Sequence, residues 1–232
     1  IISEDITFVN GEIEDFISIA INNKGRENIN IFNSLISNVQ SIYRRLFSFE
    51  TRARNKQSIG FHYDSPPSQI YKYMLGPSMM YSCALWDKGG PDKQTLEEAQ
   101  YAKINFLKKK LLLNESDKLL EVGFGNGSFL LNIAEEHNIP LHGVSLSEEQ
   151  TKVAREKQKE KNLDNANILF EVKDFKDIKG KNLYSKLCSI GQMEHSLNYK
   201  DYFKKIYELL TDNGIAVIHY IGSNTVPRPE ND

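Results

Sequence analysis

The chain has 232 residues, of which 40% are hydrophobic and 26% charged, and its formal net charge at pH 7 is −2. This length allows one sizeable hydrophobic core with or without a small appendage, so we expect one main domain. Proteins that bind polyanions carry a basic excess or a dense basic stripe, so we expect no nucleic-acid partner.

The two cysteines lie far apart, at Cys83 and Cys188, and match no spacing of metal ligands. A disulfide scaffold is therefore excluded, no metal site is expected, and a reduced cytoplasmic protein is the simplest interpretation. No apolar run approaches the ~20 residues that span a bilayer, and the chain does not start with the pattern of a signal peptide. The sequence predicts a protein that is soluble or at most peripheral to a membrane.

The first 60 residues carry no chemical motif and are expected to form a mainly helical extension. Within 42–56, apolar side chains recur at helical spacing while Arg44, Arg45 and Arg52 fall on the other side, which predicts an amphipathic basic helix. Two interpretations stay open. The helix packs its apolar face on the domain, or it contacts an anionic membrane surface.

From Lys118, short apolar runs alternate with helical segments, which is typical of an α/β domain with a mostly parallel, doubly wound, Rossmann-like sheet. The predicted elements are, in chain order, a strand with a glycine turn over 118–127, a helix over 128–138, a strand over 141–146, a helix over 147–161, strands over 168–175 and 186–191, a helix over 199–210 and a strand over 215–222. Asp212-Asn213-Gly214 is expected to stop the last helix.

Ligands of such folds lie over the carboxyl ends of the strands, and glycines after the first strand let the backbone approach them closely. Gly123, Gly125 and Gly127 give G-x-G-x-G, which is not the spacing of a dinucleotide site. We expect their backbone groups to hold a ligand with an amino-acid part and a nucleoside part, with Glu121 facing its ammonium. The alternative is a tight turn without a ligand.

Polar residues also follow the second and third predicted strands. Ser147 and Gln150 form S-x-x-Q before a helical run, so helix capping alone explains both of them. Asp174 and Phe175 end the third strand, where a carboxylate and an aromatic ring can meet the amino group and the face of a nucleobase.

Three strings are far more specific than the glycine turn, namely YSCALW at 81–86, MEH at 193–195 and VIHYIG at 217–222. With the glycine turn and the segments between them, they resemble the cyclopropane-fatty-acid synthase family of S-adenosylmethionine-dependent class I methyltransferases. The resemblance runs in unbroken order over about 61–223 and implies a methyltransferase domain over 61–232 behind an extension of 1–60.

The resemblance implies transfer of a methyl from S-adenosylmethionine to the cis double bond of an unsaturated phospholipid acyl chain, followed by proton loss and closure of a cyclopropane ring. It also implies bicarbonate as the base and a peripheral position on the inner membrane face. A homodimer is compatible with it. An alkene is a weak nucleophile, so catalysis should rest on alignment within a dry, apolar site.

Site residues follow position by position from the resemblance. The residues expected at the base site are Cys83 (through its main chain), Ile190, Glu194 and His219. The residues expected at the cofactor site are Tyr81, Ser82, Glu121, Gly123, Gly125, Gly127, Ser145, Leu146, Ser147, Gln150, Asp174 and Phe175. A carboxylate beside bicarbonate needs a shared proton or a bridging donor, and His219 is the expected donor.

The sequence departs from the family pattern in three places. Phe124 and Asn126 replace the usual Cys and Trp of the glycine loop, which leaves the backbone cradle intact. Gln192 begins Q-M-E-H where M-F-E-H is usual, which leaves the substrate detail open. The sequence ends soon after His219, so we expect a C-terminally truncated fold that binds the cofactor and turns over poorly.

Two other functions stay open. One is a methyltransferase that makes a methyl-branched or methylene fatty acid or acts on another acceptor. The other is a non-catalytic, methyltransferase-like subunit.

Overall fold

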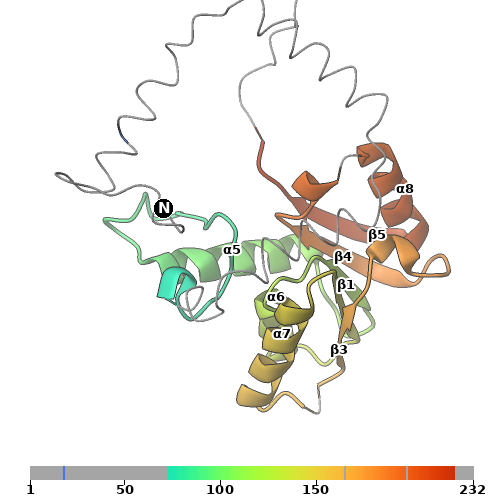
Figure 1. The fold of residues 1–232 in the computed structure, drawn as a ribbon, viewed down its shortest axis with the longest axis horizontal. Coiled ribbons are helices and arrows are strands. Elements are labelled where there is room, and N and C mark those ends of the chain that lie inside the picture. Colours follow the sequence, from blue (N-terminus) through green and yellow to red (C-terminus); the bar gives the residue numbers. More distant parts are fainter. Residues whose placement is uncertain (1–17, 19–72, 165, 197, 223–232) are drawn as a thin grey trace, which may run out of the picture. The chain divides into compact units, whose positions relative to one another are not determined.

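A computed structural model describes residues 18, 73–164, 166–196 and 198–222 (Figure 1). The chain divides into two compact units, Ile1–Phe49 and Glu50–Asp232, and the elements described below belong to the second. The basic helix predicted over 42–56 lies outside the described residues.

A parallel sheet forms the centre of the second unit. Its strands are β1 (Leu119–Val122), β2 (Leu141–Ser145), β3 (Ile168–Val172), β4 (Tyr184–Ile190) and β5 (Leu210–His219). Their order is β3-β2-β1-β4-β5, and each neighbouring pair is parallel. The chain builds outward from β1 in one direction and then returns to add β4 and β5 on its other side. The predicted Rossmann-like α/β fold is confirmed, and its switch point lies between β1 and β4.

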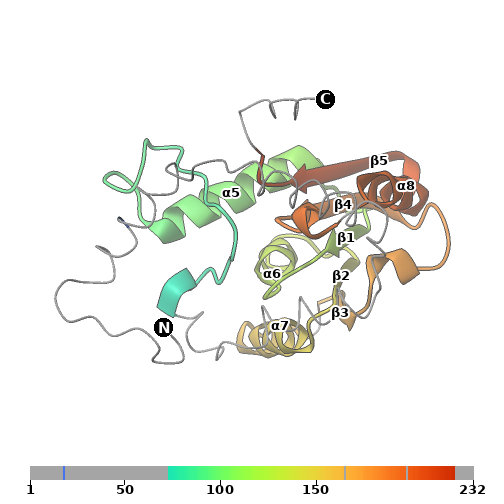
Figure 2. The ribbon, with the colours of Figure 1, turned by 45° about the horizontal axis from the view of Figure 1, so that its top comes forward.

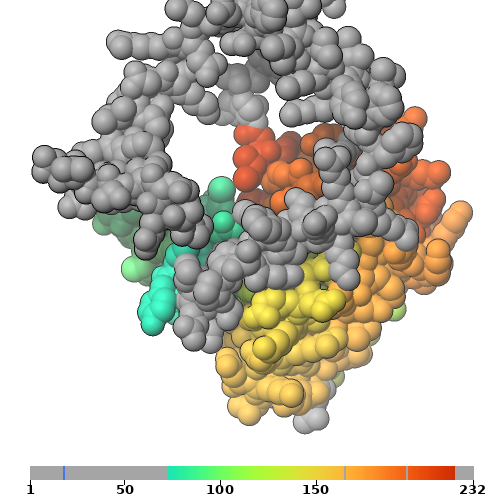
Figure 3. Space-filling model, in the orientation of Figure 1, coloured from blue at the N-terminus to red at the C-terminus, as the bar shows by residue number. Residues whose placement is uncertain are grey.

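Helices cover both faces of the sheet. They are α5 (Leu96–Leu111), α6 (Ser128–Ala134), α7 (Glu148–Glu160) and α8 (Tyr199–Leu209), with the 3-10 turns η1 (Phe175–Asp177) and η2 (Met193–His195). In Figure 2, α6 and α7 lie on one side of the sheet and α8 on the other. The space-filling view shows α7 (yellow) in close contact with the orange segments that follow it in the chain (Figure 3).

Alternate residues of β1 point into two separate hydrophobic clusters. Leu119 joins side chains of α5, α6 and α7, whereas Leu120 and Val122 join those of α8 and η1. All four residues of β1 are buried, which is expected for a central parallel strand covered by helices on both faces.

The helix α5 was not among the predicted elements. Its N-cap Thr95 accepts a hydrogen bond from the Glu98 backbone N–H, and the Glu98 carboxylate accepts one from the Thr95 backbone N–H. This capping box was readable as T-x-x-E in the sequence. The apolar stripe was harder to read, because the buried side of α5 also carries Gln100 and Lys103.

The passage from α8 into β5 differs from the prediction in detail. The helix ends at Leu209, one residue earlier than predicted, and the strand begins at once. Leu210 pairs with Tyr184, but the next paired residue is Ile215, so residues 211–214 form an irregularity in the register. After it, the regular pairing with β4 extends to Ile190 and His219 at the carboxyl end of the sheet.

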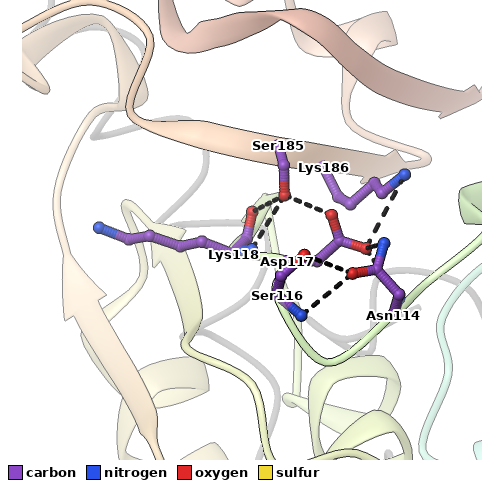
Figure 4. A network of polar contacts seen from close by, with 6 residues as sticks. All are labelled: Asn114, Ser116, Asp117, Lys118, Ser185 and Lys186. Atoms are coloured by element: carbon purple, nitrogen blue, oxygen red, sulfur yellow. Dashed lines mark hydrogen bonds and ion pairs between the residues drawn. The ribbon is translucent and has the colours of Figure 1, made fainter.

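A polar network joins the opposite, amino ends of β1 and β4 (Figure 4). The Asp117 carboxylate accepts hydrogen bonds from the Asn114 backbone N–H at 2.8 Å and from the Ser185 hydroxyl at 2.6 Å. Lys186 Nζ lies 3.9 Å from Asp117 Oδ2, and both side chains are almost fully buried. This network fixes the relative height of the two strands whose other ends carry the site.

Candidate functional site

A cavity opens at the carboxyl ends of β1, β2 and β4, where the fold places its ligand. Of the predicted site residues, those that line it are Tyr81, Ser82, Glu121, Gly123, Gly125, Ser145, Leu146, Gln150, Asp174, Phe175 and Ile190. The remaining predicted residues, which do not line it, are Cys83, Gly127, Ser147, Glu194 and His219.

The glycine turn between β1 and α6 forms the floor of the cavity. Gly123 has φ +75°, and a Cβ there would come closer than 3.0 Å to the Gln192 side chain. Gly127 also has a positive φ, but its Cα faces Ala154 and Phe170, so its small size serves packing against α7 and β3. Only the first part of the G-x-G-x-G string therefore faces the cavity.

Glu121 ends inside the cavity as a nearly unexposed carboxyl, with 2% of the residue exposed. Its Oε2 atom has no hydrogen-bond partner among the described residues. Burial raises the pKa of this carboxyl to about 8. A buried acceptor without a partner fits a positively charged ligand group, such as the ammonium of an amino acid.

The segment 79–82 forms a second wall and is held from two sides. Asn126 Nδ2 of the glycine turn donates to the Met79 carbonyl at 3.1 Å. From α5, Gln100 Nε2 donates to the Ser82 carbonyl at 2.9 Å and Lys103 Nζ donates to the Ser82 hydroxyl at 2.7 Å. The roles of Gln100 and Lys103 were not predicted from the sequence, because their helix was not among the predicted elements.

Residues after β2 bind one another closely. Ser147 is the N-cap of α7 and accepts a hydrogen bond from the Gln150 backbone N–H at 3.1 Å, which confirms the cap at Ser147. The capping role predicted for the Gln150 side chain is wrong, because its Oε1 accepts from Ser145 instead of from the Ser147 backbone N–H. The Ser145 hydroxyl donates to Gln150 Oε1 at 3.0 Å and accepts from the Ser147 backbone N–H. Ser147 is fully buried, whereas Ser145 and Gln150 also face the cavity.

Asp174 and Phe175, which the sequence predicts to meet the nucleobase, both line the cavity. Asp174 Oδ1 accepts a hydrogen bond from the Lys176 backbone N–H at 2.9 Å and so caps η1. The Phe175 ring is mostly buried, with its centroid 5.1 Å from that of Tyr202. Packing against Tyr202 accounts for the buried part of the Phe175 ring. The part that lines the cavity presents an apolar surface.

A second group of polar side chains lies at the ends of β4 and β5. Glu194 Oε1 accepts a hydrogen bond from the Ile221 backbone N–H at 2.6 Å. Glu194 Oε2 and His219 Nδ1 are both buried, and neither has a hydrogen-bond partner among the described residues. Burial lowers the pKa of His219, the charge of Lys103 lowers it further, and Glu194 acts in the opposite direction.

The cavity and the polar side chains at the ends of β4 and β5 meet at one wall. Ile190 lines the cavity and pairs in register with His219, and the Gly191 backbone N–H donates to the His219 carbonyl at 2.9 Å. The Cys83 side chain is exposed, and the hydrogen bonds within the described ranges do not connect it with Glu194 or His219. Gln192, which the sequence analysis treated only as a departure, lines the cavity with a buried, unpartnered Oε1.

Two features are absent from the described part of the chain. It contains no cluster of three or more His, Cys, Asp or Glu side chains suited to a metal ion. None of its helices combines the length and apolar character needed to cross a membrane.

Comparison with known proteins gives consistent matches. The family model described as mycolic acid cyclopropane synthetase matches residues 50–230. The cyclopropane-fatty-acyl-phospholipid synthase of Escherichia coli K12 is 31% identical over 77% of this chain and 44% of its own, and a probable fatty acid methyltransferase of Pseudomonas putida is 32% identical over 76% and 45%. The chain thus spans about half the length of the curated relatives it matches.

Solved structures agree with the sequence matches. The mycolic acid cyclopropane synthase CmaA1, complexed with SAH and CTAB, superimposes with a TM-score of 0.63 and 26% identity, over 74% of this chain and 57% of that one. Coclaurine N-methyltransferase bound to SAH reaches a TM-score of 0.66 at 21% identity, which is a likeness of fold alone.

Proposed function

Because this chain belongs to the mycolic acid cyclopropane synthetase family, we propose that it carries out the cofactor-binding and base chemistry of a cyclopropane-fatty-acyl-phospholipid synthase. The reaction would transfer a methylene from S-adenosylmethionine to the cis double bond of an unsaturated phospholipid acyl chain. The single observation that carries the proposal is the shared wall at Ile190, which joins the cavity to the buried Oε2 atom of Glu194 and the buried Nδ1 atom of His219.

The cavity fits the cofactor. Glu121 offers an unpartnered carboxyl for the ammonium, and the backbone of Gly123 and Gly125 offers a close approach. Ser145, Leu146, Gln150, Asp174 and Phe175, which line the cavity, are the proposed contacts on the side of the nucleoside, whereas the buried Ser147 holds the start of α7 behind them. When bound, S-adenosylmethionine supplies an electrophilic methyl group.

The residues at the end of β4 and β5 fit a small anion that accepts a proton. Glu194 is oriented by the Ile221 backbone N–H, so its buried Oε2 is left to share a proton with such an anion. The His219 Nδ1 atom is the second unpartnered group, and Cys83 and Ile190 would add main-chain contacts. These features support bicarbonate as the base, in line with the family resemblance.

The acceptor and its surroundings are part of the proposal. The name of the Escherichia coli relative supports phospholipid acyl chains as the acceptor. With this acceptor we propose a peripheral position on the inner membrane face and, as one option, a homodimer. Another class of product remains a candidate because a probable fatty acid methyltransferase is as similar, and because Gln192 changes the cavity wall. That product is a methyl-branched or methylene fatty acid.

The test is incubation of the protein with labelled S-adenosylmethionine and liposomes of mono-unsaturated phospholipid, followed by chromatographic separation of the fatty acid methyl esters beside cyclopropane and methylene standards, and by mass analysis. One added methylene with no remaining double bond supports ring closure. One added methylene with a surviving double bond indicates the second candidate, and label that stays on the cofactor supports a non-catalytic subunit.

Matched variants localise the chemistry. His219→Gln should abolish product formation while leaving S-adenosylhomocysteine affinity within about twofold, because His219 lies outside the cavity lining. His137→Gln, which changes a histidine beside Glu115 and outside the cavity lining, should retain most of the activity. Equal losses in the two variants would contradict the proposed role of His219.

A further inference from the structure

Lys103 of α5 is a buried lysine, with 3% of the residue exposed. The ion pairs among the described residues do not include it, whereas Lys108 of the same helix pairs with Glu136 at 2.7 Å. Burying an ammonium without a counter-charge is costly, so a buried lysine is retained where its charge or its hydrogen bonds serve the site.

The hydrogen bonds of Lys103 all go to one residue. Its Nζ donates to the Ser82 hydroxyl at 2.7 Å and approaches the Ser82 carbonyl at 3.4 Å. An ammonium has no acceptor, so the Ser82 oxygen must accept in this bond. The Ser82 hydrogen is therefore directed to another acceptor, and Ser82 lines the cavity.

The cavity offers a complementary pair of positions for a zwitterion. Glu121 provides an unpartnered carboxyl for a cation, and Ser82, backed by Lys103, provides a donor next to a positive charge. Lys173 also lines the cavity, but its Nζ is bound to Glu171 at 2.7 Å. The carboxylate of an amino acid is the acceptor that fits the Ser82 position, because charged acceptors form the stronger hydrogen bonds.

We propose that Lys103 is a positioning residue that sets the Ser82 hydroxyl as a hydrogen-bond donor to the carboxylate of the cofactor's amino-acid part. The inference rests on the proposed function only in that the ligand is an S-adenosyl amino acid. Gln100 supports the same arrangement, because its Nε2 fixes the Ser82 carbonyl at 2.9 Å.

The ammonium also affects the neighbouring base site. Burial lowers the pKa of Lys103 to about 8, so most molecules carry the charge at pH 7. That charge contributes to the lowered pKa of His219. A single side chain of α5 thus acts on both parts of the site.

Two ligands that differ in one part test the proposal by isothermal titration calorimetry at pH 7. S-Adenosylhomocysteine carries the amino-acid part, and methylthioadenosine keeps only the nucleoside and the thioether. Lys103→Met should weaken S-adenosylhomocysteine by about tenfold, the order expected for one charge-assisted hydrogen bond, and methylthioadenosine by less than about twofold.

A double-variant comparison separates positioning from general support. If Lys103 acts through Ser82, Ser82→Ala combined with Lys103→Met should bind S-adenosylhomocysteine no more weakly than Ser82→Ala alone. Lys108→Met is the matched control, since it removes a largely buried lysine of the same helix that contacts Asn132 and Glu136 instead. It should leave both affinities unchanged.

The outcomes are distinct. Equal losses for the two ligands, or no loss for either, would overturn the role of Lys103 while leaving the proposed function in place. A wild-type protein that fails to bind S-adenosylhomocysteine would overturn the cofactor assignment itself. If Lys103→Met does not fold, the two ligands are compared with Lys103→Gln instead. This variant keeps an N–H donor but loses the charge.

Discussion

The buried carboxyl of Glu121 should make cofactor binding depend on pH. Glu121→Gln keeps the size of the side chain and removes its titration. In the free protein, burial holds the pKa of Glu121 at about 8, so this group is mostly protonated at neutral pH. A ligand ammonium is attracted to the ionised carboxylate, so binding must release the proton.

The size of the effect follows from the pKa. With a value of about 8, about one molecule in eleven is ionised at pH 7 and about one in a hundred at pH 6. Affinity for S-adenosylhomocysteine should therefore rise about ninefold between pH 6 and pH 7. At pH 7, deprotonation of Glu121 makes the binding free energy less favourable by about 1.4 kcal/mol, which corresponds to one pKa unit.

Calorimetric titrations in two buffers with different heats of ionisation measure both the affinity and the proton released. The wild type should release nearly one proton at pH 6.5, and Glu121→Gln should release almost none and lose the rise in affinity. Glu149→Gln, which changes another glutamate of the cavity lining, is the control and should behave as the wild type does. An affinity that is flat between pH 6 and pH 7 in the wild type would refute the assignment of Glu121 to the ammonium.

Three further predictions concern stability and the glycine turn. Burial lowers the pKa of His142, so the folded state disfavours its protonation and the free energy of unfolding should decrease as the pH falls below about 6.5; urea unfolding of His142→Gln should show a weaker decrease. Asp117→Ala leaves the buried Lys186 without its counter-charge and should lower the free energy of unfolding by about 3–5 kcal/mol in urea titrations. Gly123→Ala forces a Cβ into a neighbouring glutamine and should cost about 1–3 kcal/mol in thermal unfolding, more than Gly76→Ala, whose site has a similar φ and no neighbour within 4 Å.

The sequence predicted the parallel sheet well because each strand is a short apolar run between a turn and a helix with clear start signals. Strand ends were less accurate: β3 ends at Val172, three residues before the predicted end, and β5 begins at Leu210. Local patterns do not specify how far pairing continues. The irregularity at 211–214 arises from the register with β4, a partner remote in the sequence.

Within the site, the sequence identified residues on recognisable motifs and missed those that act through tertiary contact. The cavity lining contains Glu121 and Gly123 as expected, because strand and glycine turn are adjacent in the chain. Lys103 and Gln100 contact a segment about 20 residues before them, and nothing in the local pattern of α5 indicates that contact. Both are polar residues on the mainly apolar, buried side of α5, and this position can be recognised only once the helix is assigned.

The replaced residues of the glycine turn show how such contacts offset a change of motif. Phe124 in place of the family's Cys is buried against Phe170, with ring centroids 5.0 Å apart, and fills the space over Gly143. Asn126 in place of the Trp binds the Met79 carbonyl and so ties the turn to the segment that Lys103 holds from the other side. Both replacements hold the wall of the cavity in place, so we expect this turn to offer a ligand the same backbone groups as the family's G-C-G-W-G turn.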